Sequence, residues 1–222
     1  MKEYMKMGLI LLAYCAIAGF ALGIVYVVTR DRILLAELSE KLQAIETVLK
    51  DDKGNYITSL SEIKAGLEAA EGEGVIFSDP FGKVYAPVYK FKSPLGDIYV
   101  LTGSGIGYGG EVKVVASFIK KPEGFELFSV RVTEYAKETP GLGARIGEEE
   151  VQRRFYPMPA EAIKNGILVD VDARATHLSP EEAKKKGIAK ISDVMTGATI
   201  TSRAVADALT VMIQYLYTEV LK

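Results

Sequence analysis

The chain has 222 residues, of which 49% are hydrophobic and 25% charged. It is long enough for one domain with a buried hydrophobic core and, in addition, a membrane anchor. Its net charge is only -2 and it has no long run of Lys or Arg, which gives no electrostatic reason to expect a nucleic-acid partner. Cys15 and His177 are the only residues of their types, so neither an intrachain disulfide nor a His/Cys zinc site is expected. Any redox chemistry would therefore need a bound cofactor.

Residues 1–30 are predicted to form a membrane anchor. The segment between Lys6 and Arg30 is uncharged, and at about 1.5 Å per residue a helix of this length crosses a hydrocarbon core of about 30 Å. A cleaved signal peptide is the competing interpretation, but its apolar region is shorter and ends at small residues. A lipoprotein site at Cys15 would need a small residue where Tyr14 stands. Flanking charge leaves the sidedness open.

Residues 31–70 are predicted to form a juxtamembrane helical segment. Apolar residues recur there at spacings of three and four, which predicts a helix from Arg32 to Lys50 with one apolar face. The residues of this face are Leu34, Leu35, Leu38, Leu42, Ile45 and Leu49. The face can pack on the following domain or the membrane surface, and contact with a partner protein is the alternative.

Residues 71–222 are predicted to form one α+β domain. Segments rich in Val, Ile, Tyr and Phe, separated by Gly and Pro, predict a twisted antiparallel sheet. These segments are 75–79, 82–91, 97–103, 111–119 and 125–132. Flanking helices are predicted near 148–156 and 180–186, a short strand at 166–171, and a long amphipathic helix from Ser202 to the C-terminus.

A glycine-rich loop at Gly105–Gly110 formally satisfies the GxGxxG pattern of dinucleotide-binding proteins. In such proteins a helix follows the loop, whereas here a strand pattern begins at Glu111. The loop is therefore interpreted as a tight connection between two strands.

Two further segments have the composition of ligand loops. Glu138–Gly143 reads Glu-Thr-Pro-Gly-Leu-Gly and can bring backbone amides close to a ligand, although it is also a good turn. Asp193–Thr201 reads Asp-Val-Met-Thr-Gly-Ala-Thr-Ile-Thr and places threonine hydroxyls at the start of the C-terminal helix. This arrangement suits the binding of a phosphate. A helix cap made by Thr199 or Thr201 explains the same residues equally well.

The Asp193–Thr201 segment resembles the flavinylation signature of the FMN-binding subunits of Rnf and Na⁺-translocating NADH:quinone reductase complexes. In that family a flavin transferase joins FMN to the final threonine, here Thr201. The family's Glu-Thr-Pro-Gly-Leu-Gly element stands intact at Glu138–Gly143, and its Gly-Tyr-Gly-Gly element at Gly107–Gly110. A histidine common in the family just before Glu138 is absent. The modest chain length is more similar to the RnfG subunits than to the longer FMN-binding subunits of the quinone reductase.

The resemblance implies a site built around the covalent phosphoester of FMN on Thr201. It implies that Gly197, Ala198 and Thr199 shape the phosphate turn and that Tyr108 neighbours the flavin. Glu138, Thr139, Gly141 and Leu142 would contact the cofactor from the second loop. No catalytic residue and no metal ligand are expected.

The implied function is electron transfer within a membrane ferredoxin:NAD oxidoreductase complex coupled to Na⁺ or H⁺ translocation. The partners would be other membrane subunits, and a flavin transferase during maturation. The implied location is the cell inner membrane, with one span and the FMN domain on the periplasmic side. Two alternatives stay open: an anchored FMN-binding sensor outside any ion pump, and an assembly protein without flavin. Co-purification with multispanning subunits would distinguish the electron carrier from the sensor.

Overall fold

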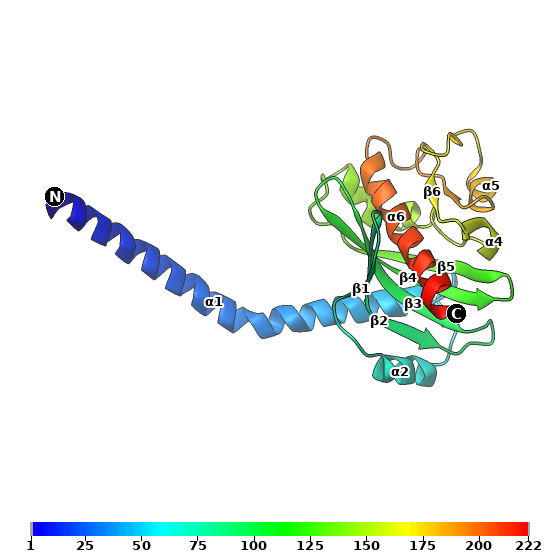
Figure 1. Ribbon diagram of the computed structural model, residues 1–222, viewed down its shortest axis with the longest axis horizontal. Coiled ribbons are helices and arrows are strands. Elements are labelled where there is room, and N and C mark those ends of the chain that lie inside the picture. Colours follow the sequence, from blue (N-terminus) through cyan, green and yellow to red (C-terminus); the bar gives the residue numbers. More distant parts are fainter. Residues whose placement is uncertain (1, 222) are drawn as a thin grey trace. The chain divides into compact units, whose positions relative to one another are not determined.

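The computed structural model describes the backbone of residues 2–221, with side chains for 4–29 and 39–221. The chain divides into two units, residues 1–42 and 43–222. The first contains most of a long helix, α1 (Lys2–Val48), and the second is the α+β domain (Figure 1). The predicted fold class is confirmed.

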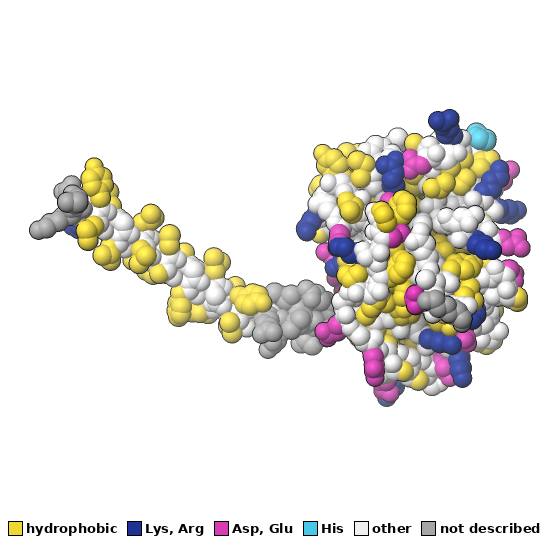
Figure 2. All heavy atoms as spheres, viewed as in Figure 1, with side chains coloured by type: hydrophobic (Ala, Val, Ile, Leu, Met, Phe, Trp, Pro, Cys, Tyr) yellow, Lys and Arg dark blue, Asp and Glu magenta, His cyan; other side chains and the backbone are white. Residues whose placement is uncertain are grey.

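The N-terminal unit is an apolar helix. Within the described residues, Tyr4–Thr29 is a helical segment of 26 residues that is long and apolar enough to cross a membrane. Figure 2 shows its surface covered mostly by hydrophobic side chains. The predicted anchor and juxtamembrane helix belong to one continuous helix. Of the predicted apolar face, Leu34, Leu35 and Leu38 lie outside the residues whose side chains the structure describes.

The domain is built on an antiparallel sheet in which each strand pairs with its neighbours in sequence order. The strands are β1 (Val75–Ser78), β2 (Gly82–Phe91), β3 (Ile98–Ile106), β4 (Glu111–Lys121) and β5 (Gly124–Glu134). All five correspond to predicted segments. Strands β3 and β4 pair without interruption from Ile98 opposite Ile119 to Ile106 opposite Glu111. The loop at 107–110 is therefore a strand connection, as interpreted from the sequence.

Helix α6 (Thr199–Tyr215) packs across one face of the sheet, and a π-helical turn, η2 (Leu216–Val220), follows it (Figure 1). Its apolar residues join alternate residues of β3 and β4, such as Leu101 and Phe118, in the larger core cluster. A Cβ atom at Gly105 would overlap the Ala204 carbonyl, so glycine allows this close approach of helix and strand.

The opposite face of the sheet is covered by the end of α1 and by α2 (Leu60–Ala69). Ile45 and Leu49 are buried there against the other set of alternating residues, including Val100 and Val115. The Ser117 hydroxyl donates a 2.7 Å hydrogen bond to the Val48 carbonyl and satisfies an acceptor at the helix end. The part of the predicted juxtamembrane segment from residue 43 onward thus packs on the sheet, which is one of the contacts expected for its apolar face.

Replacing Leu49 with alanine is expected to destabilise the domain by about 2–5 kcal/mol, because its fully buried side chain would leave a cavity. Leu42, which is 45% exposed, provides the control, and its replacement with alanine should change stability by less than about 0.5 kcal/mol. Chemical unfolding of the detergent-solubilised chain measures both. Equal stability of the two variants would contradict the packing of this segment.

Between β5 and α6 the chain forms short elements that the sequence predicted only in part. Of the range near 148–156, where a helix was expected, only a four-residue helix forms, and a 3₁₀ turn precedes it. The strand expected at 166–171 is two residues long and pairs in parallel with a second short strand. Helix α4 and strand β7 were not predicted. These elements are η1 (Gly143–Gly147), α3 (Glu149–Gln152), α4 (Ala160–Ile163), β6 (Leu168–Val169), α5 (Pro180–Lys184) and β7 (Ile188–Ala189).

Candidate functional site

A cavity of about 380 Å³ lies between the N-terminal end of α6 and the loop that follows β5. It falls within the usual range of about 300–1,000 Å³ for small-molecule sites. Its lining residues are Tyr108, Glu138, Thr139, Leu142, Gly143, Gly197, Ala198, Thr199, Ile200 and Thr201. Three segments far apart in the sequence therefore meet at one site.

The structure brings together all but one of the predicted site residues. Gly141 does not line the cavity, and its role is conformational, since its φ of +75° in the loop turn is a value that favours glycine. Sequence reasoning missed two lining residues, Gly143 and Ile200. Gly143 is the last residue of the Glu-Thr-Pro-Gly-Leu-Gly element, and Ile200 stands between Thr199 and Thr201. Both residues could therefore have been predicted from their position within the two sequence motifs.

The start of α6 differs from a conventional helix cap. The N-cap residue is Ala198, which has no side-chain hydrogen bond to the first turn. The alternative that Thr199 or Thr201 serves only as a cap is therefore wrong. The first backbone N–H groups of a helix have no acceptor within the helix, and they carry the positive end of its dipole. This end of α6 faces the cavity and suits an anionic group.

Thr201 lies in the first turn of α6 and is only 1% exposed. Its hydroxyl donates a 2.5 Å hydrogen bond to Oε2 of Glu138, which is 4% exposed. The Gly109 N–H donates to the other carboxylate oxygen, Oε1, at 3.0 Å. The inner part of the cavity is therefore polar and closely organised.

The outer part of the cavity is apolar. Tyr108 is 74% exposed, and Leu142 and Ile200 are 47% and 46% exposed. Exposed apolar side chains that cluster at a cavity mark a binding surface more often than isolated ones do. A polar inner end and an apolar rim match a ligand that has a phosphate at one end and a flat aromatic ring at the other.

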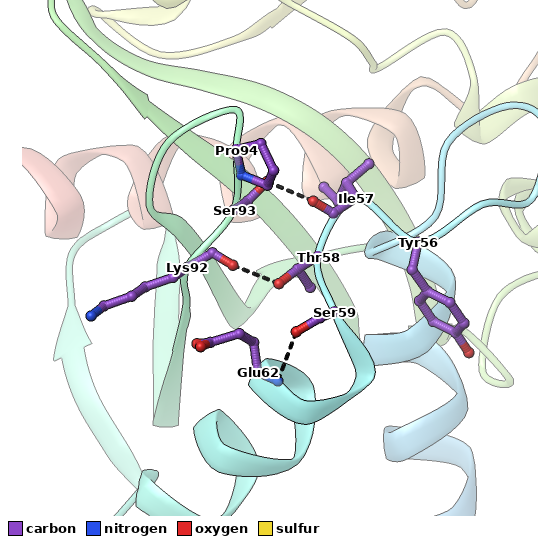
Figure 3. A pocket seen from close by; sticks show the side chains of 8 residues that line it. All are labelled: Tyr56, Ile57, Thr58, Ser59, Glu62, Lys92, Ser93 and Pro94. Atoms are coloured by element: carbon purple, nitrogen blue, oxygen red, sulfur yellow. Dashed lines mark hydrogen bonds between the residues drawn. The ribbon is translucent and has the colours of Figure 1, made fainter.

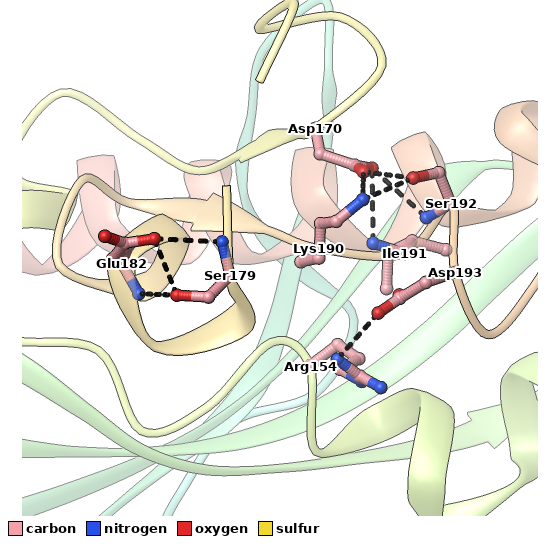
Figure 4. A network of polar contacts seen from close by, with 8 residues as sticks. All are labelled: Arg154, Asp170, Ser179, Glu182, Lys190, Ile191, Ser192 and Asp193. Atoms are coloured by element: carbon pink, nitrogen blue, oxygen red, sulfur yellow. Dashed lines mark hydrogen bonds and ion pairs between the residues drawn. The ribbon is translucent and has the colours of Figure 1, made fainter. Parts of the chain in front are cut away.

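The segment that leads into α6 is held by buried polar contacts (Figure 4). Asp170 is fully buried and accepts hydrogen bonds from Lys190 Nζ at 3.0 Å, the Ser192 hydroxyl at 2.5 Å and the Ile191 N–H at 3.2 Å. Burial alone raises the pKa of Asp170, but these bonds outweigh it and hold the pKa below its ordinary 3.8. The carboxylate thus anchors the chain just before the Asp193–Thr201 segment.

Asp193, the first residue of that segment, forms an ion pair with Arg154 at 3.2 Å (Figure 4). Asp193 does not line the cavity. Its contribution is therefore to fix the segment on the neighbouring α3 region, outside the cavity itself.

Another cavity, of about 520 Å³, lies where the loop before α2 meets the turn between β2 and β3 (Figure 3). Its walls are joined by hydrogen bonds from the Thr58 hydroxyl to the Lys92 carbonyl at 2.6 Å and from the Ser93 hydroxyl to the Ile57 carbonyl at 2.5 Å. These bonds satisfy the polar groups of the two loops, and none of the predicted site residues lies there. The smaller cavity beside α6 is the better candidate because its polar groups converge inside it.

Comparison with known proteins identifies the domain that contains the cavity. Residues 107–214 match the family model described as an FMN-binding domain, a range that includes every cavity residue. The chain is 25% identical over 223 residues to the G subunit of an ion-translocating oxidoreductase complex from Methanosarcina acetivorans, covering 97% of this chain and 95% of that protein. It is 28% identical over 131 residues to the G subunit of a proton-translocating ferredoxin:NAD(+) oxidoreductase complex from Clostridium ljungdahlii, covering 58% and 60%.

The fold also matches a solved structure. A crystal structure from Thermotoga maritima, described as an RnfG subunit of an electron transport complex, aligns with a TM-score of 0.65 and 41% identity. The alignment covers 82% of this chain and 98% of that one. These similarities confirm the resemblance carried by the three sequence elements. The chain belongs to the family of RnfG subunits of ion-translocating oxidoreductase complexes and contains their FMN-binding domain.

Proposed function

We propose that the protein is an electron-carrying flavoprotein subunit of a membrane ferredoxin:NAD oxidoreductase complex coupled to Na⁺ or H⁺ translocation, with FMN esterified through its phosphate to Thr201. The observation that carries the proposal is the position of the Thr201 hydroxyl, inside the cavity at the N-terminal end of α6. A ferredoxin:NAD oxidoreductase is the complex named for the Clostridium relative.

The residues of the cavity fit the cofactor. The backbone N–H groups in the first turn of α6, with Gly197, Ala198 and Thr199, would hold the phosphate. Thr139 and Leu142, in the turn that Gly141 permits, would contact the flavin ring, with Tyr108 beside it. Bound FMN supplies electron transfer, and the protein fixes its position and excludes water from the phosphate end.

Covalent attachment suits a carrier that works outside the cell interior, because a dissociable flavin would be lost by dilution. In the proposed arrangement α1 crosses the cell inner membrane once through Tyr4–Thr29, and the domain lies on the periplasmic side. A flavin transferase attaches the cofactor there. Neighbouring membrane subunits donate and accept the electrons, and the protein alone has little activity.

Mass spectrometry of the full-length chain co-expressed with a flavin transferase tests the covalent site. We expect an FMN-sized addition on the tryptic peptide 191–203, which fragmentation assigns to Thr201. Protein expressed without the transferase is the control and should carry no addition. An unmodified peptide in the co-expressed protein would overturn covalent attachment and leave a dissociable flavin.

A further inference from the structure

Glu138 is a buried carboxylate without a cation beside it. It is 4% exposed, and the ion pairs among the described residues do not include it. Its two contacts are the hydroxyl of Thr201 and the backbone N–H of Gly109. A buried carboxylate is costly unless its oxygens are hydrogen-bonded. Both hydrogen bonds of Glu138 lie at the cavity, so the side chain is placed to serve that site.

The surroundings of Glu138 are shaped to admit this side chain. A Cβ atom at Gly143 would lie 2.5 Å from Glu138 Oε2 and 2.8 Å from Thr201 Oγ1, and a Cβ at Gly107 would collide with Glu138 Oε1. Only glycine at these two positions leaves room for the carboxylate. The pair is therefore a preformed feature of the fold, in which the Thr201 hydroxyl already donates a hydrogen bond to the Glu138 carboxylate.

We propose that Glu138 accepts the proton of the Thr201 hydroxyl when the flavin is attached, and that it keeps this proton in the loaded protein. This inference rests on the proposed function. The flavin donor must be activated as a phosphoanhydride, for which flavin adenine dinucleotide has the required chemistry. The Thr201 Oγ1–H bond breaks, the Oγ1–P bond to the flavin-side phosphorus forms, and the phosphoanhydride bond to AMP breaks. The proton goes to Glu138, AMP leaves, and nothing is oxidised or reduced.

The charge balance explains why the proton would remain. After attachment the ester oxygen of Thr201 has no hydrogen to donate, and the phosphodiester carries about one negative charge. An ionised Glu138 beside it would place two like charges in one buried site, which is unfavourable. A protonated Glu138 removes the repulsion and can donate to the phosphodiester. The total charge of the site is the same before and after attachment.

Replacing Glu138 with glutamine tests whether this side chain accepts the proton or only holds the Thr201 hydroxyl in place. The glutamine amide can accept from the Gly109 N–H and donate to the Thr201 oxygen, so both contacts are kept, but it cannot take the proton. We expect the initial rate of FMN addition to fall by about 100-fold or more, the usual contribution of a positioned base. The assay uses the full-length chain in detergent with flavin transferase and flavin adenine dinucleotide, followed by intact mass.

Glu134→Gln is the matched control. Glu134 lies at the end of the same strand β5, in an exposed ion pair with Lys113, and does not line the cavity. It should be labelled at the wild-type rate. Labelling of Glu138→Gln at the wild-type rate would overturn the inference while leaving the covalent site intact. Failure of the wild-type protein itself to be labelled would instead contradict the proposed function.

Infrared difference spectroscopy tests the retained proton without any substitution. Loaded minus unloaded wild-type protein should show a new carboxylic acid C=O band that shifts when glutamate is labelled with ¹³C. No shifting band would mean that the proton leaves the site, which contradicts the second part of the inference. This measurement stays decisive if the glutamine variant fails to fold.

Discussion

Replacing Thr201 with valine is expected to abolish covalent flavin completely. Valine has nearly the shape of threonine but no hydroxyl, so the acceptor atom disappears while the packing at the start of α6 remains. The Glu138 carboxylate then loses one of its two hydrogen-bond donors. This should cost about 1–3 kcal/mol of stability, as for a buried polar group left unpaired. Intact mass after co-expression with the transferase and thermal unfolding measure the two effects.

Two further variants serve as controls for Thr201→Val. Thr201→Ser keeps a hydroxyl at the same position in the helix and should still be labelled. Thr199→Val removes the other cavity-lining hydroxyl near the start of α6, which belongs to the proposed phosphate site, so it should still be labelled at Thr201 but more slowly. A covalent flavin that survives in Thr201→Val would show that a different residue is the acceptor.

Replacing Asp170 with asparagine is expected to destabilise the domain by about 3–5 kcal/mol near neutral pH, because it leaves the buried Lys190 ammonium without its counter-ion. The pKa of Asp170 is lower in the folded chain than in the unfolded chain. Its stabilising contribution is therefore fully present above the ordinary, unfolded pKa of 3.8 and is lost as the pH falls through the folded pKa. The difference between wild type and variant should shrink over that acid range.

Asp172→Asn is the control for this experiment. Asp172 pairs with Arg203 at 2.6 Å, but both side chains are substantially exposed, so its loss should cost about 1 kcal/mol or less. Urea unfolding between neutral and acid pH measures both variants. A difference between wild type and Asp170→Asn that does not change with pH would contradict the assigned role of the carboxylate.

The sheet could be predicted from the sequence because its strands are local features. Each is a run of β-branched and aromatic residues bounded by Gly or Pro, and each pairs with the next strand along the chain. The parallel pair β6–β7 could not be predicted in this way. Its strands are two residues long and 20 positions apart, so the pairing depends on tertiary contacts around Asp170.

The two loops of the candidate site could be predicted from the sequence, but the way in which they come together in space could not. Motif composition identified both the Glu138–Gly143 loop and the threonines at the start of α6. The hydrogen bond that joins Thr201 to Glu138 links residues 63 positions apart, and no local pattern encodes it. The same holds for the burial of Thr201 and for the glycines that surround the carboxylate, since these depend on how α6 packs against β3.

The order in which the site is assembled follows from the strand topology. The sheet contains only hairpin pairings between sequence neighbours, which have low contact order and can form early in folding. The cavity is expected to form later, because one wall comes from the residues after β5 and the other from α6. A truncated or half-folded chain therefore offers no complete acceptor site. The cofactor would then be attached only to molecules that have finished folding.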